Sequence, residues 1–301
     1  MPLLVLGSVA YDTIQTPFDR RDRILGGSGV YAACAASFFT DVNLVGVVGE
    51  DWRQSDTRFI EQFGVNTQGL ETRKGAKTLY WSGKYFNNMN DRETLEIELN
   101  VMGENWDPIV PPSYQDVPFV LLANGSPSCH LALLEKVKTP KLVIADTMDF
   151  YINNMKDNLL KLMKKIDGLI LNDSEVKLLT GSPNCISAGK AILEMGPKFV
   201  VVKKGEHGAL YISPEEIYIV PAFPTENVVD PTGAGDSFVG ALMGCLAKTG
   251  IEDTSKIKNA LASAAVTAAF CCEGFSLEKL KTVSREQIEE RLAALRKMCS
   301  F

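Results

Sequence analysis

Short runs of aliphatic and β-branched residues recur along this chain, and segments with a helical spacing of apolar residues lie between them. The apolar runs span residues 3–6, 42–48, 119–123, 142–145, 168–171 and 199–202. The helical segments span residues 29–39, 128–138, 154–165, 174–180 and 186–194. Continuous apolar strands separated by helices are typical of a parallel sheet that is covered on both faces. The pattern therefore predicts an α/β fold, a doubly wound and mostly parallel sheet with helices on both faces.

Two segments depart from this rhythm. Residues 11–25 and 69–101 alternate polar and apolar positions, as in the stretch 78–85, and a turn is expected at residues 87–90. These ribbons are too small to fold alone, so we expect a small β-sheet lid over the core, and its exposed face is a candidate homodimer contact. After residue 236 the chain is mostly helical, and with neither repeat nor linker, residues 1–301 are expected to form a single domain.

Composition limits the partners that this chain can have. Its 301 residues are 46% hydrophobic and 23% charged, with a formal net charge of -6 and no block of Lys or Arg. We therefore expect no nucleic-acid partner and no membrane partner. The run at residues 3–6 is too short for a signal peptide, and the seven cysteines are odd in number and mostly lie in apolar segments. Both features favour a cytoplasmic protein with reduced thiols.

The most informative local sequence is the stretch Asp230-Pro231-Thr232-Gly233-Ala234-Gly235-Asp236-Ser237-Phe238. Small residues precede an apolar run that is predicted to begin a buried helix, so their backbone N–H groups form an anion site at a helix N-terminus. A carboxylate beside such a site is unfavourable unless it accepts a proton, which indicates that Asp236 is a general base. In the alternative interpretation the glycines only shape a turn and Asp236 is a charge at the helix N-terminus.

Three other segments carry candidate chemistry. Asn172 and Glu175 follow the apolar run 168–171, at the carboxyl end of a strand where open α/β sheets bind ligands; the alternative is a capping box. Residues 201–210 read as strand, glycine-bounded turn and strand, and the alternative is a plain hairpin. A glycine-rich loop precedes the helical segment 29–39, and the alternative is a tight helix entry.

Several enzyme classes find no support in this sequence. A Gly-x-x-x-x-Gly-Lys-Ser/Thr motif is absent, which argues against a P-loop ATPase. His130 and His207 are the only histidines, so a Ser-His-Asp hydrolase or a histidine-rich metal site is poorly supported. The adjacent Cys271 and Cys272 lack a histidine nearby and are not interpreted as a metal or redox site. Catalysis is left to carboxylates, lysines and backbone dipoles.

The stretch 230–238 closely resembles the C-terminal signature of the PfkB carbohydrate kinase family, the ribokinase-like sugar and nucleoside kinases. Segments 45–51, 63–67 and 261–274 are similar to the family as well, so the resemblance spans nearly the whole chain. It implies a ribokinase-like fold and ATP-dependent phosphoryl transfer to a hydroxyl group. In this resemblance Asp236 is the base, and Gly233, Ala234 and Gly235 form the anion hole.

The resemblance also implies the remaining site residues. It assigns acceptor binding to Asp12, Gly26, Gly27, Ser28, Tyr31 and Asn124. It assigns the nucleotide to Asn172, Lys203, Gly205, Glu206, Gly208 and Ser263. It implies Mg²⁺ held through water by Asn172 and Glu175, and a monovalent cation, K⁺, at Asp230 and Thr232. Two positions depart from the family, because Tyr31 and Ser263 stand where asparagine is common.

The acceptor stays open at this stage. A small-molecule sugar is the first expectation, on the overall likeness of the sequence. A nucleoside is the alternative, since a base needs a flat apolar surface that Tyr11, Tyr31, Trp81 or Phe86 can offer. A catalytically silent sugar or nucleotide sensor on the same fold is a third reading. The intact Asp236, Asn172 and Glu175 favour an enzyme.

Overall fold

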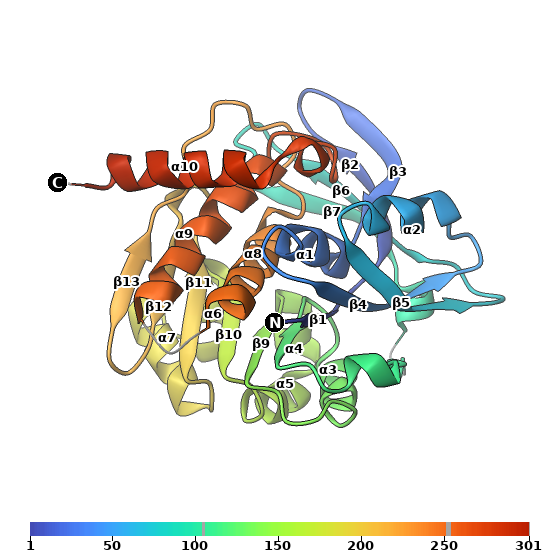
Figure 1. Cartoon of the computed structure of the whole chain (residues 1–301), viewed down its shortest axis with the longest axis horizontal. Helices are drawn as coiled ribbons and strands as arrows, with labels where there is room; N and C mark the ends of the chain where they lie inside the picture. The colour runs from blue at the N-terminus through green and yellow to red at the C-terminus, as the bar shows by residue number, and fades with distance from the viewer. Residues whose placement is uncertain (104–105, 251–253, 301) are drawn as a thin grey trace.

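The computed structural model describes residues 1–103, 106–250 and 254–300 and is built around one nine-stranded sheet (Figure 1). Its strand order is β13-β12-β11-β10-β9-β8-β1-β4-β5. The β11–β12 and β12–β13 pairs are antiparallel, and the other neighbouring pairs are parallel. The strands are β1 (Leu3–Leu6), β4 (Val42–Gly49), β5 (Val65–Arg73), β8 (Phe119–Leu122), β9 (Leu142–Asp146), β10 (Gly168–Asn172), β11 (Phe199–Lys203), β12 (Ala209–Ile212) and β13 (Ile217–Val220). The predicted doubly wound, mostly parallel sheet is confirmed.

Helices cover both faces of this sheet, as Figure 1 shows. One face carries α1 (Ser28–Ala36), α2 (Gln54–Glu61), α8 (Ala234–Thr249), α9 (Thr254–Cys271) and α10 (Arg285–Met298). The other carries α3 (Pro127–Leu134), α4 (Asp149–Asn154), α5 (Lys156–Met163), α6 (Asp173–Thr180) and α7 (Cys185–Glu194). Each face has its own apolar core, so the central strands are buried on both sides and their sequences are continuously apolar. None of the described helices is long and apolar enough to span a membrane.

A second sheet of four strands lies beside the main one. Its order is β3-β2-β6-β7, with β2 (Ala10–Gln15), β3 (Arg20–Gly26), β6 (Leu79–Tyr85) and β7 (Arg92–Glu98). The predicted lid segment 69–101 begins too early. Its first residues belong to β5, which pairs with β4 at the edge of the main sheet. Polar side chains along β5 match its edge position, and they gave the segment the alternation expected of a lid ribbon.

The two faces of the small sheet have different neighbours. Tyr11 is 2% exposed and stacks on Trp52 with ring centroids 5.3 Å apart, and the Arg53 guanidinium lies over the tyrosine ring, 4.7 Å from its centroid. This face is therefore anchored to the segment before α2. On the opposite face, Ile14 and Tyr85 pack with Phe275, which follows α9. The small sheet is thus held to the main body at both of its faces.

Helices α1 and α8 pack unusually close together. A Cβ atom at Gly240 would lie 2.1 Å from the carbonyl oxygen of Ala32, and one at Gly244 would lie 2.6 Å from that of Ala36. Only residues without a side chain allow this approach of two helix backbones. Both helices begin at the same end of the sheet, so the glycine-rich loops that precede them lie side by side.

Candidate active site

The loop that opens α8 has the geometry of an anion site. Gly233 is the N-cap of the helix with φ +77°, and residues 233–236 are partly open to solvent. A Cβ atom at Gly233 would lie 2.3 Å from the ring of Tyr31 on α1, so glycine is needed here for backbone conformation and for space. The first helical turn therefore leaves N–H groups at a partly exposed surface, although the N–H of Ala234, a predicted member of the anion hole, donates to the Pro231 carbonyl oxygen at 3.2 Å.

Asp236 lies in the first turn of α8, at this loop. Burial raises the pKa of its carboxyl group to about 6, and the nearby Asp146 adds to the rise while Lys203 and Arg92 oppose it. A carboxylate with a pKa near neutrality is suited to accept a proton during a reaction. The capping role that the sequence left open is not excluded by this position, since an acidic residue in a first turn also favours the helix dipole.

The second glycine-rich loop places another carboxylate next to the first. Asp12 on β2 is 4% exposed and lies against Gly26, where an added Cβ atom would lie 1.9 Å from Asp12 Oδ2. Burial, together with the charges of Asp230 and Asp236, raises its pKa to about 8. Ser28 Oγ donates to the Asn124 carbonyl oxygen at 2.8 Å, and the buried Asn124 Oδ1 has no partner among the described residues. Among the predicted acceptor residues, Asp12 thus lies close enough to Asp236 for their charges to interact, and Ser28 contacts Asn124.

A third carboxylate, Asp230, is completely buried at the start of the same loop. Its Oδ1 accepts from the Thr232 backbone N–H at 2.9 Å, whereas Oδ2 has no partner among the described residues. Burial raises the pKa of this carboxyl group to about 6. The Cys271 thiol contacts the Thr232 carbonyl oxygen at 3.6 Å, which gives this cysteine a structural place below the loop.

Asn172 and Glu175 form the capping box that the sequence offered as an alternative. Asn172 Oδ1 accepts from Ser174 N, Ser174 Oγ and Glu175 N, and Glu175 Oε2 accepts from Asn172 N at 2.6 Å. The amide oxygen of Asn172 already accepts these three hydrogen bonds. The predicted role of this oxygen in holding Mg²⁺ is therefore corrected to a helix-capping role. Only its Nδ2 hydrogens remain for a ligand, and these suit phosphate oxygens. Burial raises the pKa of Glu175 to about 7, with Lys203 opposing and Asp146 adding.

Lys203, at the end of β11, supplies the local cation. Its Nζ donates to Asp146 Oδ2 at 2.7 Å and would lie 3.4 Å from a Cβ atom placed on Gly235. Burial alone would lower the pKa of Lys203, but the carboxylates of Asp146, Glu175 and Asp236 outweigh it and raise the pKa. Asp146 was missed at the sequence level, although it ends an apolar strand just as Asn172 does.

Arg92 on β7 was also missed. It is paired in register with Tyr85, its guanidinium lies 5.6 Å from the Trp81 ring centroid, and it interacts with the Tyr85 hydroxyl group. That hydroxyl accepts from Thr232 Oγ1 at 3.1 Å, so the small sheet is connected to the anion loop. Arg92 is solvent-exposed yet close enough to interact with the charges of Asp12, Asp236 and Glu175.

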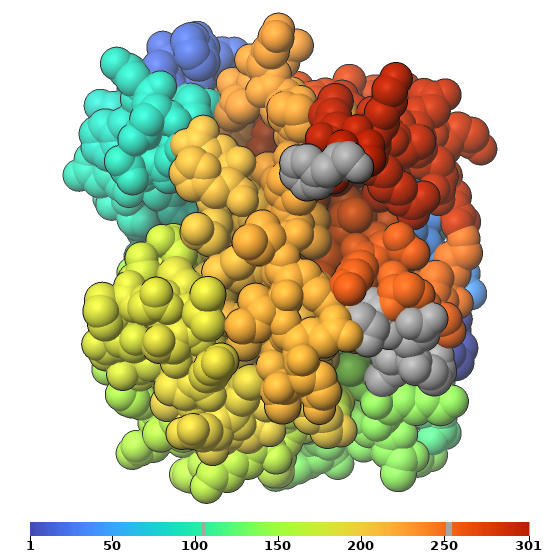
Figure 2. Space-filling model, turned by 90° about the vertical axis from the view of Figure 1, so that its left-hand side faces the viewer, coloured from blue at the N-terminus to red at the C-terminus, as the bar shows by residue number. Residues whose placement is uncertain are grey.

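The turn at residues 205–208 is the predicted hairpin turn between β11 and β12. Glu206 is exposed, and its carboxylate accepts from Asn90 Nδ2 of the small sheet at 3.0 Å. Figure 2 shows the turquoise residues of the small sheet beside the gold residues that follow β11. A Cβ atom at Gly208 would lie 2.0 Å from the Val220 carbonyl oxygen. Glycine is therefore needed here to make room for the protein's own backbone rather than for a ligand.

Three predicted roles are corrected by burial. Ser263 is 4% exposed and donates to the Asn259 carbonyl oxygen within α9, so its hydroxyl is not directed at a nucleotide. Tyr31 is 1% exposed, with its ring against Gly233, and therefore offers no open face for stacking. Tyr11 is equally unavailable because it stacks on Trp52. These side chains support the site from the core.

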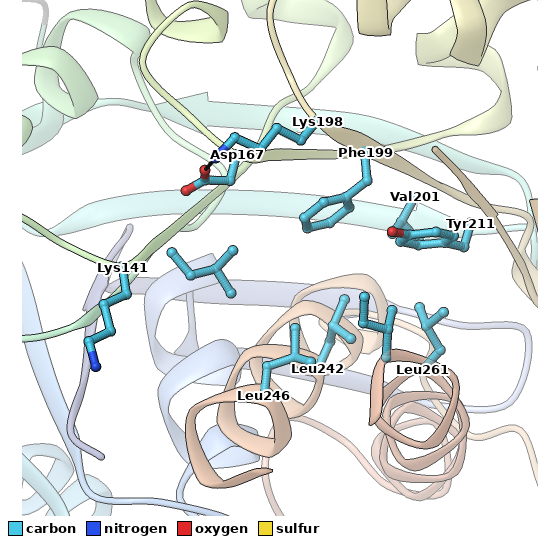
Figure 3. Close-up of a pocket in the computed structure, with 11 residues that line it drawn as sticks. Lys141, Asp167, Lys198, Phe199, Val201, Tyr211, Leu242, Leu246 and Leu261 are labelled. Atoms are coloured by element: carbon cyan, nitrogen blue, oxygen red, sulfur yellow. Dashed lines mark ion pairs between the residues drawn. The ribbon is translucent and has the colours of Figure 1, made fainter. Parts of the chain in front are cut away.

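An apolar cavity of about 180 Å³ lies at the opposite end of the sheet (Figure 3). Phe199, Leu242 and Leu246 point into it, and the ion pair between Asp167 and Lys198 lies on its rim at 2.7 Å. None of the residues that line it belongs to the predicted site. It borders the first residues of β9 and β11, whereas Asp146 and Lys203 are their last.

Comparison with known protein families matches residues 4–278 to the pfkB family of carbohydrate kinases. The chain belongs to this family. A cytidine kinase from Thermococcus kodakarensis is 26% identical over 253 residues, which are 81% of this chain and 87% of that protein. The family and its kinase relatives make this PfkB chain a phosphotransferase with a hydroxyl acceptor.

Solved structures agree with this PfkB fold. A nucleoside kinase from Methanocaldococcus jannaschii superposes with a TM-score of 0.79 at 20% identity, covering 97% of this chain and 98% of that one. A putative ribokinase II from E. coli, solved in complex with ATP and Mg²⁺, has a TM-score of 0.78 at 21% identity, covering 97% and 99%. ATP and Mg²⁺ are consistent with this family.

The burial of Tyr31 generates a prediction about stability. Tyr31→Ala should lower the free energy of unfolding by about 3–5 kcal/mol, because it empties a large buried site below Gly233. Tyr31→Phe keeps the ring and removes a buried hydroxyl group without a described partner, so stability should stay within about 1 kcal/mol of wild type. Urea unfolding of both variants measures the difference. A Tyr31→Ala variant of unchanged stability would mean that the ring is not a core element.

Proposed function

We propose that this chain transfers the γ-phosphoryl group of ATP to a hydroxyl group on a sugar unit. The observation that carries the proposal is the meeting of two helix N-termini, one with Asp12 beside it and the other with Asp236 in its first turn. A hydroxyl group bound between these carboxylates would have a base on one side and the anion site in front of it. A silent sensor would not need a partly open carboxylate with a pKa near neutrality at that point.

The chain's own groups divide the chemistry between them. Asp12 binds and orients the acceptor's hydroxyl groups, and Asp236 accepts the proton of the reacting hydroxyl group as its oxygen attacks the γ-phosphorus in line. The backbone N–H groups of Gly233 and Gly235 and the ammonium group of Lys203 stabilise negative charge on the transferred group. Arg92 approaches the same space from the small sheet. Closure of that sheet would exclude water, which otherwise competes as the acceptor.

The residues present fit a magnesium ion held mainly through water. Glu175 presents a buried carboxylate at the carboxyl end of β10, and only its Oε2 is fixed by the capping box. Oxygen ligands reached through water suit Mg²⁺, which keeps much of its hydration shell in proteins. When bound, Mg²⁺ would neutralise part of the negative charge on the phosphate groups.

The residues around Asp230 fit a monovalent cation such as K⁺. The buried Asp230 Oδ2 has no hydrogen bond among the described residues, and the Thr232 carbonyl oxygen accepts from the Cys271 thiol, a weak donor. A buried carboxylate in this state is unfavourable unless a proton or a cation compensates for it. We assign the cation site to these two residues.

For the acceptor we favour a nucleoside over a free sugar, which reverses the preference drawn from the sequence. Asp12 is paired in register with Trp81 on β6, and Trp81 with Ile97 on β7, so the three side chains share one sheet face. The indole lies over Gly83, where a Cβ atom would approach it to 2.1 Å, and Ile97 is 55% exposed. This apolar row beside a hydroxyl-binding carboxylate suits a base attached to a ribose. The similarity to a cytidine kinase supports the same choice.

The small sheet is also the surface through which we propose that two copies pair. Strand β7 is its edge, and every residue of the strand is exposed, including Leu95 and Ile97. An exposed edge strand with apolar side chains is a template for pairing with another chain. Sedimentation velocity measures the oligomeric state directly.

Replacing the proposed base tests the mechanism. Asp236→Asn should lower kcat by about 10²–10⁴-fold while ATP binding and folding are retained, because the variant loses a positioned base. In the wild type, kcat/KM should fall as the pH drops through about 6, since protonated Asp236 cannot accept the proton. Steady-state assays across pH and calorimetric ATP titrations check both. Turnover near the wild-type rate would reduce Asp236 to a helix-capping charge.

The magnesium assignment has its own test. Glu175→Gln should raise the Mg²⁺ concentration that gives half-maximal rate, because a neutral amide orders the metal's waters less well. Ser284 and Gln287 form a second capping box at the start of α10, and neither residue belongs to the predicted site. Gln287→Ala is therefore a matched control that should leave the titration unchanged. An unchanged titration for Glu175→Gln would restrict this residue to its capping role.

A panel of acceptors separates the two substrate classes. With cytidine, inosine, ribose and fructose as acceptors, we expect the higher kcat/KM for a nucleoside. Trp81→Ala should raise the KM for that nucleoside with a smaller effect on kcat, because contacts far from the reacting oxygen contribute equally before and during transfer. Phe18→Ala, at the exposed turn between β2 and β3 of the same sheet, is the control. Efficient phosphorylation of free sugars alone would return the assignment to a sugar kinase.

A further inference from the structure

The ion pair between Asp146 and Lys203 is the most deeply placed charge pair of the described site. The two side chains are 3% and 18% exposed, and the Nζ to Oδ2 distance is 2.7 Å. They end β9 and β11, which flank β10, so both lie at the carboxyl edge of the sheet and their side chains meet at the end of β10. Asp146 also receives a hydrogen bond from the Thr147 backbone N–H at 2.9 Å, which fixes its carboxylate.

The ammonium group of Lys203 is held at the anion loop. It would lie 3.4 Å from a Cβ atom on Gly235, and it is near enough to interact with the carboxylates of Asp236 and Glu175. Under the proposed function, Asp236 belongs to the acceptor side and Glu175 to the nucleotide side. The ammonium group therefore lies where the phosphoryl group has to pass.

We propose that Asp146 is a positioning residue that fixes the Lys203 ammonium group at the anion loop, where Lys203 contacts the transferred phosphoryl group. This inference rests on the proposed function. It gives a role to Asp146, which was not among the site residues predicted from the sequence. The physical reason is the flexibility of lysine, whose four-carbon stem gives its charge many locations unless a partner holds it. A fixed cation stabilises developing charge without reorganisation during the reaction.

Two simpler roles for Asp146 make different predictions. If the pair only stabilises the fold, its removal changes the free energy of unfolding and leaves kcat, the acceptor KM and nucleotide binding of the folded protein unchanged. If the carboxylate binds the magnesium ion or its waters, its removal raises the Mg²⁺ requirement whether or not Lys203 is present. A positioning role alone makes the effect of Asp146 depend on Lys203.

A double-mutant cycle separates these roles. The variants are Asp146→Asn, Lys203→Met and the two combined, which replaces the buried ion pair by neutral groups of similar size and should fold. Each is assayed for kcat, for the KM of the acceptor and for calorimetric binding of the non-hydrolysable analogue AMP-PNP at saturating Mg²⁺. Asp167→Asn with Lys198→Met, the ion pair at the opposite end of β10 and β11, is the matched control and should leave all three unchanged.

Lys203→Met should lower kcat by about 10²–10³-fold, the loss expected for one donor to developing charge. Asp146→Asn should lower kcat about 10-fold and weaken AMP-PNP binding, with the acceptor KM unchanged within about 2-fold. In the Lys203→Met background, Asp146→Asn should have an effect below about 2-fold, because no cation is left to position. Asp146→Glu, which keeps the charge, should retain more activity than Asp146→Asn.

Independent, multiplicative effects of the two substitutions would overturn the proposal. So would an Asp146→Asn variant that recovers wild-type kcat when Mg²⁺ is raised, since the carboxylate would then act on the metal. If the wild type phosphorylates none of the acceptors, the proposed function fails, and the AMP-PNP arm still decides the inference through the same cycle. If the wild type is active and Asp236→Asn is not, the proposed function stands. Independent effects of Asp146→Asn and Lys203→Met would then count only against the positioning role of Asp146.

Discussion

The site depends on the close contact between helices α1 and α8. Gly240 and Gly244 lie directly against the carbonyl groups of Ala32 and Ala36, and Tyr31 fills the space below Gly233. Larger residues would push the helices apart, and the loops before them would separate with them. Asp236 on one loop and Asp12 near the other meet because two backbones can approach to this distance.

That convergence concentrates negative charge in a buried place. Asp12, Asp230 and Asp236 raise one another's pKa or have it raised by burial, in a chain that is already acidic overall. The fold offsets this with cations brought from two separate elements, Lys203 on the main sheet and Arg92 on the small one. Lys203 and Arg92 thus supply local positive charge in a chain whose net charge is negative.

The small sheet joins the two halves of the proposed reaction. Its β2 strand carries Asp12, while its β6 strand reaches the anion loop through the contact between Tyr85 and Thr232. The turn after β6 reaches the β11–β12 turn through Asn90 and Glu206. One face is fixed to the body by Tyr11 and Trp52, and the other, which carries Asp12 and Trp81, packs on Phe275 through Ile14 and Tyr85. An acceptor bound on that face is therefore connected to both loops that would hold the nucleotide.

Sequence alone determined most strands and helices of the core and the glycine-containing loop that opens α8, because these follow from local chemistry, whereas α2 (Gln54–Glu61), α4 (Asp149–Asn154) and β13 (Ile217–Val220) were not predicted. Apolar runs mark buried parallel strands, and small residues before an apolar helix mark a helix N-terminus that can bind an anion. The capping box at Asn172 was readable for the same reason, since its partners are three residues apart.

Tertiary structure decided what depends on distant neighbours. Asp146 acquires its role from Lys203, which is 57 residues away along the chain, and Arg92 acquires its role from a different sheet. Residues in β5 alternate as the lid strands do, and only their pairing with β4 assigns them to the main sheet. Every residue of α1 is buried, so no periodicity could show that Tyr31 faces Gly233 rather than a ligand. Local patterns carry conformational preference, but the identity of a neighbour across the core is set only when the chain has packed.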